Sequence, residues 1–418
     1  MRILHFNQRD DGGAGRAMLR LHQGLRADKI ESSAFVQVKT SDDEFIFIPD
    51  GVLGKLSAKL KLSEHISHLP LRLYKQRTSG AFSPPFALQS FTDIVHKLNP
   101  DIVHLHWINH GFLDIKTLQA FRKPIVWTLH DMWPFTGGCH YSNTCDRYKH
   151  TCGACTVLGS TKEKDLSHYI WKRKNKRWKD LDLSIVAPST WMANCARESS
   201  LFRNVPVQQI SNGLDMNQYR PIDKQSARQL LNLPQNKYLL LFGAANIEDT
   251  RKGLHLLLPA LQQLHESELN DKIELLVFGA TSFQQMQEAE FPINSLGRFA
   301  DNLSLSLVYS AADVFIAPSL EDNLPNTLVE SLACGTPAVA FNIGGIPDII
   351  DHQQNGYLAT PFEPSSLAEG IKWILQSPDK QFLHEAARQK AEQSFSLTAQ
   401  TKHYQRLYES ILSNVAAQ

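Results

Sequence analysis

The sequence has no surplus of either charge and no long apolar run. Its 418 residues hold 43 Lys plus Arg against 42 Asp plus Glu, so no global field attracts nucleic acid. No apolar run approaches the roughly 18 to 20 residues that span a bilayer. The N-terminus turns polar after the length of one strand and lacks the apolar core of a signal peptide. We therefore expect a cytoplasmic protein, with peripheral binding at the inner face of the cell membrane left open.

Cysteine is also scarce, and it is unevenly placed. Four of the six cysteines fall within 17 residues, at Cys139, Cys145, Cys152 and Cys155. The last pair has the spacing of a zinc knuckle, and a reducing cytoplasm disfavours disulfides. A structural zinc site, free thiols and disulfides are the three interpretations of this cluster. Cys195 and Cys334 are expected to be small buried residues.

Short apolar runs alternate with helical patterns along the chain. Strands are predicted at residues 3–6, 34–38, 102–106, 125–129, 185–187, 238–242, 274–278, 314–317 and 338–341. Helices are predicted at residues 88–98, 253–265, 326–334 and 395–412. Such alternation is typical of parallel sheets covered on both faces. The predicted fold class is α/β, with two Rossmann-like domains facing each other across a cleft and a linker near residues 203–211.

Glycines follow the first predicted strand in the run Asp-Gly-Gly-Ala-Gly, which includes Gly12 and Gly13. Glycines at a strand-to-helix turn let a ligand approach the backbone and the helix N-terminus. The spacing is not that of the dinucleotide motif Gly-x-Gly-x-x-Gly, so NAD binding is not supported. A tight turn without a ligand is the alternative.

Two adjacent cations, Arg251 and Lys252, precede a predicted helix that follows a buried strand. They place positive charge and helix N–H groups where a diphosphate could develop negative charge. A solvated pair in a loop is the alternative.

Two carboxylates eight positions apart, Asp322 and Glu330, lie in a loop and in the short helix after it. Pro325 can open that helix and Gly335 can close it. The preceding run 313–318 predicts a buried strand, so the loop lies at the carboxyl end of a sheet, where open α/β folds bind ligands. A carboxylate there can accept hydrogen bonds from sugar hydroxyls.

A histidine, His130, ends another predicted strand. His104 and His106 end the neighbouring strand and could reach the same crevice. A buried structural histidine is the alternative interpretation of His130.

The run from Asp322 to Pro337 resembles the signature of the retaining family 4 glycosyltransferases of the GT-B fold, a Glu-x7-Glu pattern followed by Cys-Gly-x-Pro. Glu330 matches the second Glu, which in that family binds the ribose of a nucleotide donor. Asp322 replaces the first Glu, so either Asp322 or the adjacent Glu321 would contact the donor sugar. The resemblance implies a donor-binding set of Gly12, Gly13, Glu321, Asn323, Leu324, Pro325, Asn326 and Glu330.

The same resemblance implies a catalytic set of His130, Arg251, Lys252 and Asp322. The family has an Arg directly after the strand-end Gly, and Ala244 occupies that position here, so Arg251 would supply the guanidinium. Fixed cations would then replace a catalytic metal, consistent with the lack of an Asp-x-Asp motif at a strand end. The implied domains are an acceptor-side domain at 1–209, a nucleotide-sugar domain at 210–394, and a helix at 395–418 that crosses back.

The run 136–141 is similar to bacterial exopolysaccharide and colanic-acid type transferases. It implies transfer of a hexose from a nucleoside diphosphate sugar to a glycan hydroxyl, with a lipid-linked oligosaccharide as the favoured acceptor. Two other functions fit the same motifs. One is a sugar-nucleotide epimerase or hydrolase of the same fold, and the other is a non-catalytic sugar-nucleotide binder, which Asp322 and Ala244 motivate.

A basic stretch at residues 171–179 contains six cations and two tryptophans among nine residues. Cations with interfacial aromatics suit an anionic membrane or a lipid diphosphate, and a solvated helix face is the alternative. A looser basic region in the same half comprises Lys55, Lys59, Lys61, Arg72, Lys75 and Arg77.

Overall fold

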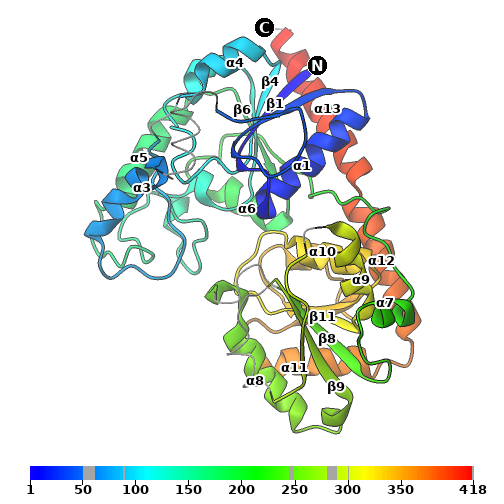
Figure 1. Ribbon diagram of the computed structural model, residues 1–418. Coiled ribbons are helices and arrows are strands. Elements are labelled where there is room, and N and C mark those ends of the chain that lie inside the picture. The colour runs from blue at the N-terminus through cyan, green and yellow to red at the C-terminus, as the bar shows by residue number, and fades with distance from the viewer. Residues whose placement is uncertain (50–61, 88–89, 244–248, 280–289, 300, 417–418) are drawn as a thin grey trace. The chain divides into compact units, whose positions relative to one another are not determined.

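The computed structural model describes residues 1–49, 62–87, 90–243, 249–279, 290–299 and 301–416. The chain forms two compact units (Figure 1). Unit 1 comprises Met1–Gly213 and Thr398–Gln418, and unit 2 comprises Leu214–Leu397. Each unit contains one parallel sheet with helices, which confirms the α/β prediction. Within the described ranges, no helix has both the length and the apolar character needed to span a membrane.

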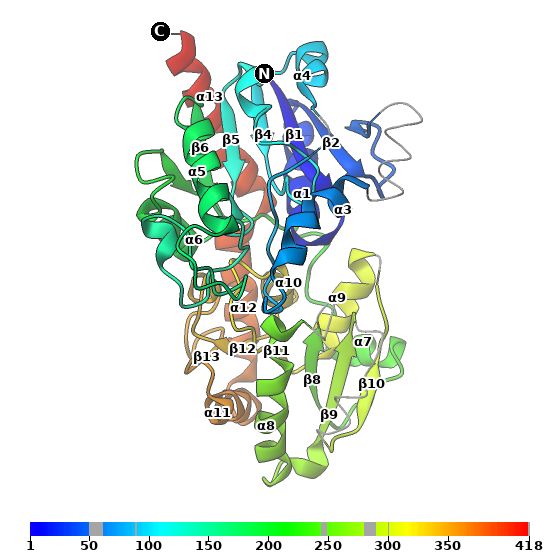
Figure 2. The same cartoon turned by 90° about the vertical axis from the view of Figure 1, so that its left-hand side faces the viewer.

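Unit 1 is built on a seven-stranded sheet in the order β3-β2-β1-β4-β5-β6-β7. Figure 2 shows β2, β1, β4, β5 and β6 side by side in this order. The strands are β1 Arg2–Arg9, β2 Glu31–Val38, β3 Ile46–Phe47, β4 Ile102–Leu105, β5 Ile125–Thr128, β6 Leu183–Ala187 and β7 Val207–Gln209. The order reverses between β1 and β4, and ligands of open parallel sheets bind beyond the carboxyl ends of the strands at such a switch point.

Helices cover both faces of this sheet. They are α1 Gly12–Ala27, α3 Leu62–His68, α4 Thr92–Leu98, α5 Leu166–Trp178, α6 Thr190–Glu198 and α13 Leu397–Ala416, with the short η1 Leu69–Leu73, η2 Leu118–Phe121, η3 Trp133–Phe135 and η4 Arg147–Lys149. Leu21 and Leu25 of α1 pack on one face together with Tyr404 and Tyr408 of α13, the red helix of Figure 1. The opposite face contains the larger apolar core, which includes Trp127.

Unit 2 has a six-stranded sheet in the order β10-β9-β8-β11-β12-β13. The strands are β8 Tyr238–Gly243, β9 Ile273–Phe278, β10 Ile293–Ser295, β11 Val314–Ala317, β12 Ala338–Phe341 and β13 Gly356–Ala359. The helices are α7 Lys224–Leu230, α8 Leu254–His265, α9 Asn302–Ala311, α10 Asn326–Ala333, α11 Pro364–Leu375 and α12 Lys380–Phe395, with the short η5 Thr250–Lys252, η6 Asn270–Lys272 and η8 Ile346–Asp348. Here the strand order reverses between β8 and β11, so the loops after these two strands lie at the switch point.

The structure differs from the sequence prediction in three places. The stretch 203–211, predicted as a linker, contains the edge strand β7, and the chain enters unit 2 at Leu214. The helix predicted at 88–98 begins at Thr92, while residues 88–89 lie outside the described chain. The helix predicted at 395–412 is the end of α12 and the start of α13, which meet at Ser396. Helical periodicity continues across that junction, so the pattern alone does not locate it.

Candidate active site

The loops after β8 and β11 bring together two residues that are 70 positions apart. The Nζ atom of Lys252 donates a hydrogen bond of 2.8 Å to Oδ2 of Asp322. Burial alone would raise the pKa of Asp322, but the charges of Lys252 and Arg251 hold it below its ordinary value. The carboxylate is therefore ionised at neutral pH, and it is almost fully buried. Both members of this ion pair belong to the predicted catalytic set.

Gly253 explains how the cation-bearing turn η5 reaches the end of β11. Its φ is +75°, and a Cβ atom there would lie 1.8 Å from the carbonyl oxygen of Pro318. Only glycine permits both this conformation and this contact. The main chain is further tied by the hydrogen bond of 2.8 Å from Leu320 N–H to the Arg251 carbonyl. The two loops therefore hold Lys252 beside Asp322.

Arg251 lies against the same loop. Its Nη1 donates to the carbonyl oxygen of Glu321 at 3.3 Å, and its Nη2 lies 3.3 Å from the carboxylate of Asp249. The position predicted to lack the family arginine, Ala244, falls outside the described residues. Glu321, like Asp322, is buried.

Glu330 lies in the second turn of α10 and is 2% exposed. It accepts a hydrogen bond of 3.1 Å from the hydroxyl of Tyr309 in α9. Burial and the Glu330 charge raise the pKa of Tyr309 well above its ordinary value, so the hydroxyl stays a donor. Pro325 is the N-cap of α10, and Asn326 is its first residue. The loop residues Asn323 and Leu324 are buried.

In unit 1, Gly12 and Gly13 open helix α1 directly after β1. A Cβ atom at either position would meet nothing within 4 Å, so the backbone borders open space. Gly15 differs, because a Cβ there would lie 2.6 Å from the Arg9 carbonyl oxygen. Close packing thus requires Gly15, while the space at the first two glycines fits the approach of a ligand.

His130 follows β5 and is partly exposed. Its Nε2 lies 3.0 Å from Nδ1 of His106. Burial lowers the pKa of His130 to about 4, against the opposing effect of Asp131, so the imidazole is neutral near pH 7. Asp131 is held by His140 at 2.7 Å and by the indole N–H of Trp107 at 2.7 Å.

The two histidines of the neighbouring strand behave differently. His106 contacts His130, whereas His104 is fully buried between Tyr408 at 2.7 Å and Thr128 at 2.8 Å. His5, His104 and His106 are the one set of three or more His, Cys, Asp or Glu side chains in the described chain whose ligand atoms could share a metal ion.

We predict that unit 1 loses stability in mild acid. Burial, and then the neighbouring imidazoles, hold the pKa values of His5, His104 and His106 well below 6.5. The unfolded chain therefore binds protons below about pH 6.5 that the folded chain does not. Each histidine then removes about 1.4 kcal/mol of stability per pH unit in that range. Urea unfolding at pH 7.5 and 5.5 measures this, and an unchanged midpoint would contradict it.

The four clustered cysteines form no disulfide in the structure. Cys152 accepts the Gly137 N–H at 3.1 Å. Burial raises the pKa of Cys152 to about 12. Burial, and then the charges of Cys155 and Cys152, raise the pKa of Cys139 well above its ordinary value. Backbone N–H groups of the kind that bond a metal-bound thiolate also reach Cys155. The cysteines are not among the described groups that could share an ion, and structural zinc stays a prediction. Cys195 and Cys334 are buried, as predicted.

The basic stretch 171–179 covers the C-terminal part of α5 and its C-cap Lys179, and its side chains point in different directions. Trp178 and Lys174 are buried, and Trp171 packs against the core. Lys174 donates to the Thr136 carbonyl at 3.1 Å and lies 3.7 Å from the ring centroid of Trp133. The tryptophans therefore do not form a membrane-interface group with the cations, because both lie on the face of α5 that packs against the core. The cations left exposed are Lys172, Lys176 and Lys179.

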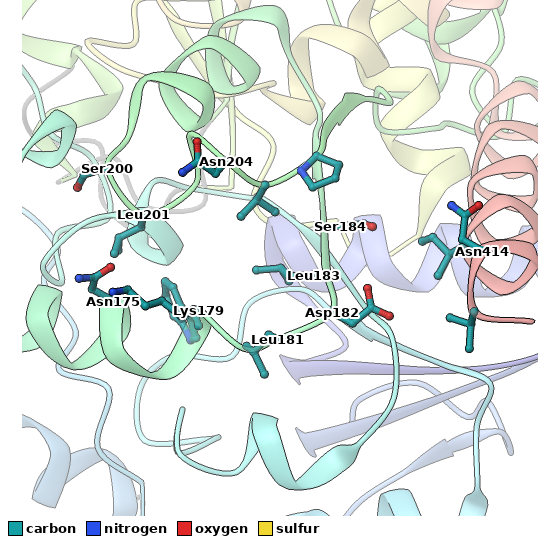
Figure 3. A pocket seen from close by; sticks show the side chains of 15 residues that line it. Asn175, Lys179, Leu181, Asp182, Leu183, Ser184, Ser200, Leu201, Asn204 and Asn414 are labelled. Atoms are coloured by element: carbon teal, nitrogen blue, oxygen red, sulfur yellow. The ribbon is translucent and has the colours of Figure 1, made fainter. Parts of the chain in front are cut away.

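A cavity of about 620 Å³ lies at the opposite end of the unit 1 sheet (Figure 3). It is lined by Leu183 at the start of β6, by Pro206 before β7 and by Asn414 of α13. The predicted site residues lie at the carboxyl ends of the strands, so this cavity does not belong to the candidate site.

The fold and these strand-end residues define a class of protein. The model of Glycosyltransferase Family 4 matches residues 11–218, and that of Glycosyl transferases group 1 matches residues 236–377. The chain belongs to the family 4 glycosyltransferases, and its fold is that of the GT-B enzymes.

Two curated relatives are similar over much of the chain. The putative colanic acid biosynthesis glycosyl transferase WcaC of Escherichia coli is 26% identical over 381 residues, covering 84% of this chain and 85% of that protein. D-inositol 3-phosphate glycosyltransferase 2 of Catenulispora acidiphila is 29% identical over 299 residues, covering 67% and 64%.

Solved structures share the fold at low identity. Sucrose-phosphate synthase from Thermosynechococcus elongatus has a TM-score of 0.69 at 18% identity, with 99% of each chain covered. HepE of Anabaena, in complex with UDP and glucose, has a TM-score of 0.65 at 18% identity, covering 98% of this chain and all of that one.

Proposed function

We propose that the protein transfers a hexose, with retention at the anomeric carbon, from a nucleoside diphosphate sugar to a hydroxyl of a growing surface polysaccharide. The observation that carries the proposal is the contact between Lys252 and Asp322. The two residues lie in the connections after β8 and β11, and Glu330 lies in the helix that follows Asp322. A diphosphate can take over the Lys252 ammonium group, which leaves the Asp322 carboxylate to accept a sugar hydroxyl. Glu330 would bind the ribose, and unit 2 would be the nucleotide-sugar domain.

The chemistry assigned to these residues is positioning and charge stabilisation. Lys252 and Arg251 would balance the charge that develops on the departing diphosphate, so no catalytic metal is required. The departing phosphate would take the proton of the acceptor hydroxyl as that oxygen bonds to the anomeric carbon on the same face. In unit 1, Gly12, Gly13 and His130 would supply further contacts to the donor.

Two similarities support this proposal. The Escherichia coli relative is described as a colanic acid biosynthesis transferase, and structural neighbours are known in complex with UDP-glucose or with UDP and GlcNAc. The test is incubation with UDP-, GDP- and ADP-sugars and membrane glycolipid, followed by NMR assignment of the anomeric configuration. A retained linkage supports the proposal. Free sugar or an epimer as the sole product would favour the hydrolase or epimerase, and donor binding without turnover would favour the binder.

We propose further that the acceptor is lipid-linked and that unit 1 binds it at the inner face of the cell membrane. A cavity of about 800 Å³ in unit 1 supports this, because its rim carries Arg72, Lys75 and Arg77. None of the three forms an ion pair within the described parts of the chain. His110 also lines the cavity. Its ring is tilted against that of Trp107, with the centroids 4.7 Å apart, and Trp107 donates to Asp131.

Apolar side chains on the same segment also favour a lipid surface. Ile66, Leu69 and Leu73 are exposed, with Leu73 at 83%, and they recur at three- and four-residue spacing along α3 and η1. Cations that have no ion-pair partner among the described residues, beside exposed apolar side chains, suit an anionic bilayer. The further cations of this region, Lys55, Lys59 and Lys61, lie outside the described residues.

We predict that reversing the charge of Arg72, Lys75 and Arg77 to Glu weakens binding to anionic vesicles by about a hundredfold or more, since each lost cation removes about 1 kcal/mol near the surface. Co-sedimentation measures the effect. The matched control changes the exposed lysines at the end of α5, Lys172, Lys176 and Lys179, to Glu, and it should bind nearly as well as the parent protein. Unchanged binding of the first variant would refute the assigned surface.

We propose that Cys139, Cys145, Cys152 and Cys155 hold a structural zinc ion. Four sulfur ligands suit zinc, and the N–H groups that reach two of the sulfurs support thiolates there. Metal analysis should find about one zinc per chain, and the double substitution Cys152→Ser, Cys155→Ser should remove it and lower the melting temperature. The control Cys195→Ser should retain zinc. A stable, metal-free parent protein would rule the site out.

A further inference from the structure

Histidines on three adjacent strands of unit 1 form a hydrogen-bonded row. His5 lies in β1, His106 directly follows β4, and His130 lies two residues beyond β5. Nδ1 of His5 is 3.0 Å from Nε2 of His106, and Nδ1 of His106 is 3.0 Å from Nε2 of His130. His5 is fully buried and His106 is 3% exposed, so the row runs from the interior to the partly exposed His130.

The row has only two proton arrangements when all three rings are neutral. A neutral imidazole has one N–H, and each nitrogen–nitrogen contact needs one donor and one acceptor. In the outward arrangement, His5 donates to His106, His106 donates to His130, and His130 carries its proton on Nδ1. In the inward arrangement every proton moves to Nε2, including that of His5. The burial that depresses the three pKa values keeps the rings neutral near pH 7.

The buried end of the row determines which of the two proton arrangements is more stable. Nε2 of His5 has no hydrogen-bond partner in the described chain. The inward arrangement would leave a buried N–H donor there without an acceptor, whereas the outward arrangement leaves only a lone pair. Orphaned buried N–H groups are rarer in proteins than under-satisfied acceptors. The outward arrangement is therefore the more stable one.

We propose that His5 and His106 are positioning residues that fix the tautomer of His130, so that His130 offers an Nδ1–H donor to the bound donor sugar. The hydrogen bond to the donor sugar rests on the proposed function, whereas the assignment of the tautomer does not. Because its Nε2 accepts from His106 and its Nδ1 carries the proton, His130 cannot act as a general base. Its contribution is a hydrogen bond of fixed direction to a hydroxyl or phosphate oxygen.

A metal ion bound by His5, His104 and His106 is a weaker explanation of the same cluster. Both nitrogens of His104 are engaged, with Tyr408 and Thr128, and both nitrogens of His106 are engaged within the row. A metal would have to break these hydrogen bonds in a fully buried site. The row uses them all.

The tautomer can be read directly from histidine-selective ¹⁵N NMR of the whole protein, with resonances assigned from single His variants. We expect Nδ1–H and unprotonated Nε2 for His5, His106 and His130. Nε2–H at His106 and His130 would overturn the proposal. This measurement needs no substrate, so it can fail or succeed independently of the proposed glycosyl transfer.

Variants of His5 test the consequence. Asn can place an amide N–H near the position of Nδ1, so His5→Asn should keep the His130 tautomer and most of the activity. His5→Leu removes the donor and should mix the tautomers of His130 and lower kcat about ten- to a hundredfold, the usual cost of losing a partner that orients a histidine. His104→Gln disturbs the same buried cluster outside the row and should leave both unchanged. If His5→Leu kept the parent tautomer at His130, the proposal would be wrong.

Discussion

Replacing Lys252 with alanine is expected to lower kcat by about two to three powers of ten, the cost of removing one preorganised donor to a developing negative charge. Lys252 is the residue whose ammonium group meets Asp322 at 2.8 Å, and in our account it leaves that carboxylate for the diphosphate of the donor. The loss should appear in kcat as well as in kcat/KM, because the charge grows in the transition state.

A matched control exists in the same unit. Lys224 pairs with Asp313 at 2.9 Å and is exposed to a similar degree, 32% against 28% for Lys252. Lys224→Ala should therefore cost comparable stability while leaving kcat near that of the parent. Steady-state kinetics with a saturating donor, together with melting curves of both variants, would compare them. Near-normal turnover in Lys252→Ala would discredit the diphosphate assignment.

Replacing Glu330 with alanine should weaken donor binding by about tenfold to a hundredfold. A hydrogen bond to a charged group contributes about 1.5–3 kcal/mol, and each 1.4 kcal/mol is about a factor of ten in Kd. Because the ribose is remote from the bond that breaks, the loss should raise KM more than it lowers kcat. Calorimetry with the nucleoside diphosphate measures the affinity directly.

Tyr309→Phe is the control for Glu330. It removes the hydroxyl that donates to the carboxylate at 3.1 Å but leaves the carboxylate itself. We expect its donor affinity to stay within a few-fold of the parent value, since an ordinary hydrogen bond contributes about 1 kcal/mol. Equal losses in the two variants, or none in Glu330→Ala, would remove the ribose role.

Local patterns located the strand ends well. Each predicted strand corresponds to an observed one, because apolar runs between helical patterns are a local signal of buried parallel strands. The candidate residues were predicted from the same pattern, because they were chosen at the ends of the predicted strands. Gly12, Gly13, His130, Lys252 and Asp322 all lie in the connection that follows the carboxyl end of a strand or in the first turn of the helix after it.

Contacts between distant segments could not be predicted in this way. The ion pair of Lys252 with Asp322 joins residues 70 positions apart, and no periodicity encodes it. Tyr309 gave no signal, since its helix α9 reads as an ordinary apolar segment. His106 gave a weak signal, because it ends the predicted strand next to the one that His130 ends, whereas His5 lies inside β1 and gave none. The row forms because the register of β1 and β4 pairs His5 with His104, which brings His5 close to His106.

For the basic stretch 171–179, the sequence predicted a larger positively charged surface than the structure shows. Composition counted six cations, but the helical period of α5 sends Lys174 into the core, where burial lowers its pKa to about 7. Arg173 pairs with Asp114 at 2.9 Å. Only three lysines of the stretch are fully exposed, and the partly buried Arg177 lies 3.4 Å from the amide oxygen of Gln119, so a count of charges overstated the surface.

The central claim is most directly tested by a crystal structure with an intact nucleoside diphosphate sugar. We predict that the diphosphate oxygens contact the Lys252 ammonium and the Arg251 guanidinium, that Asp322 turns to a sugar hydroxyl, and that Glu330 binds the ribose. A donor bound elsewhere, with Lys252 still paired to Asp322, would contradict the account.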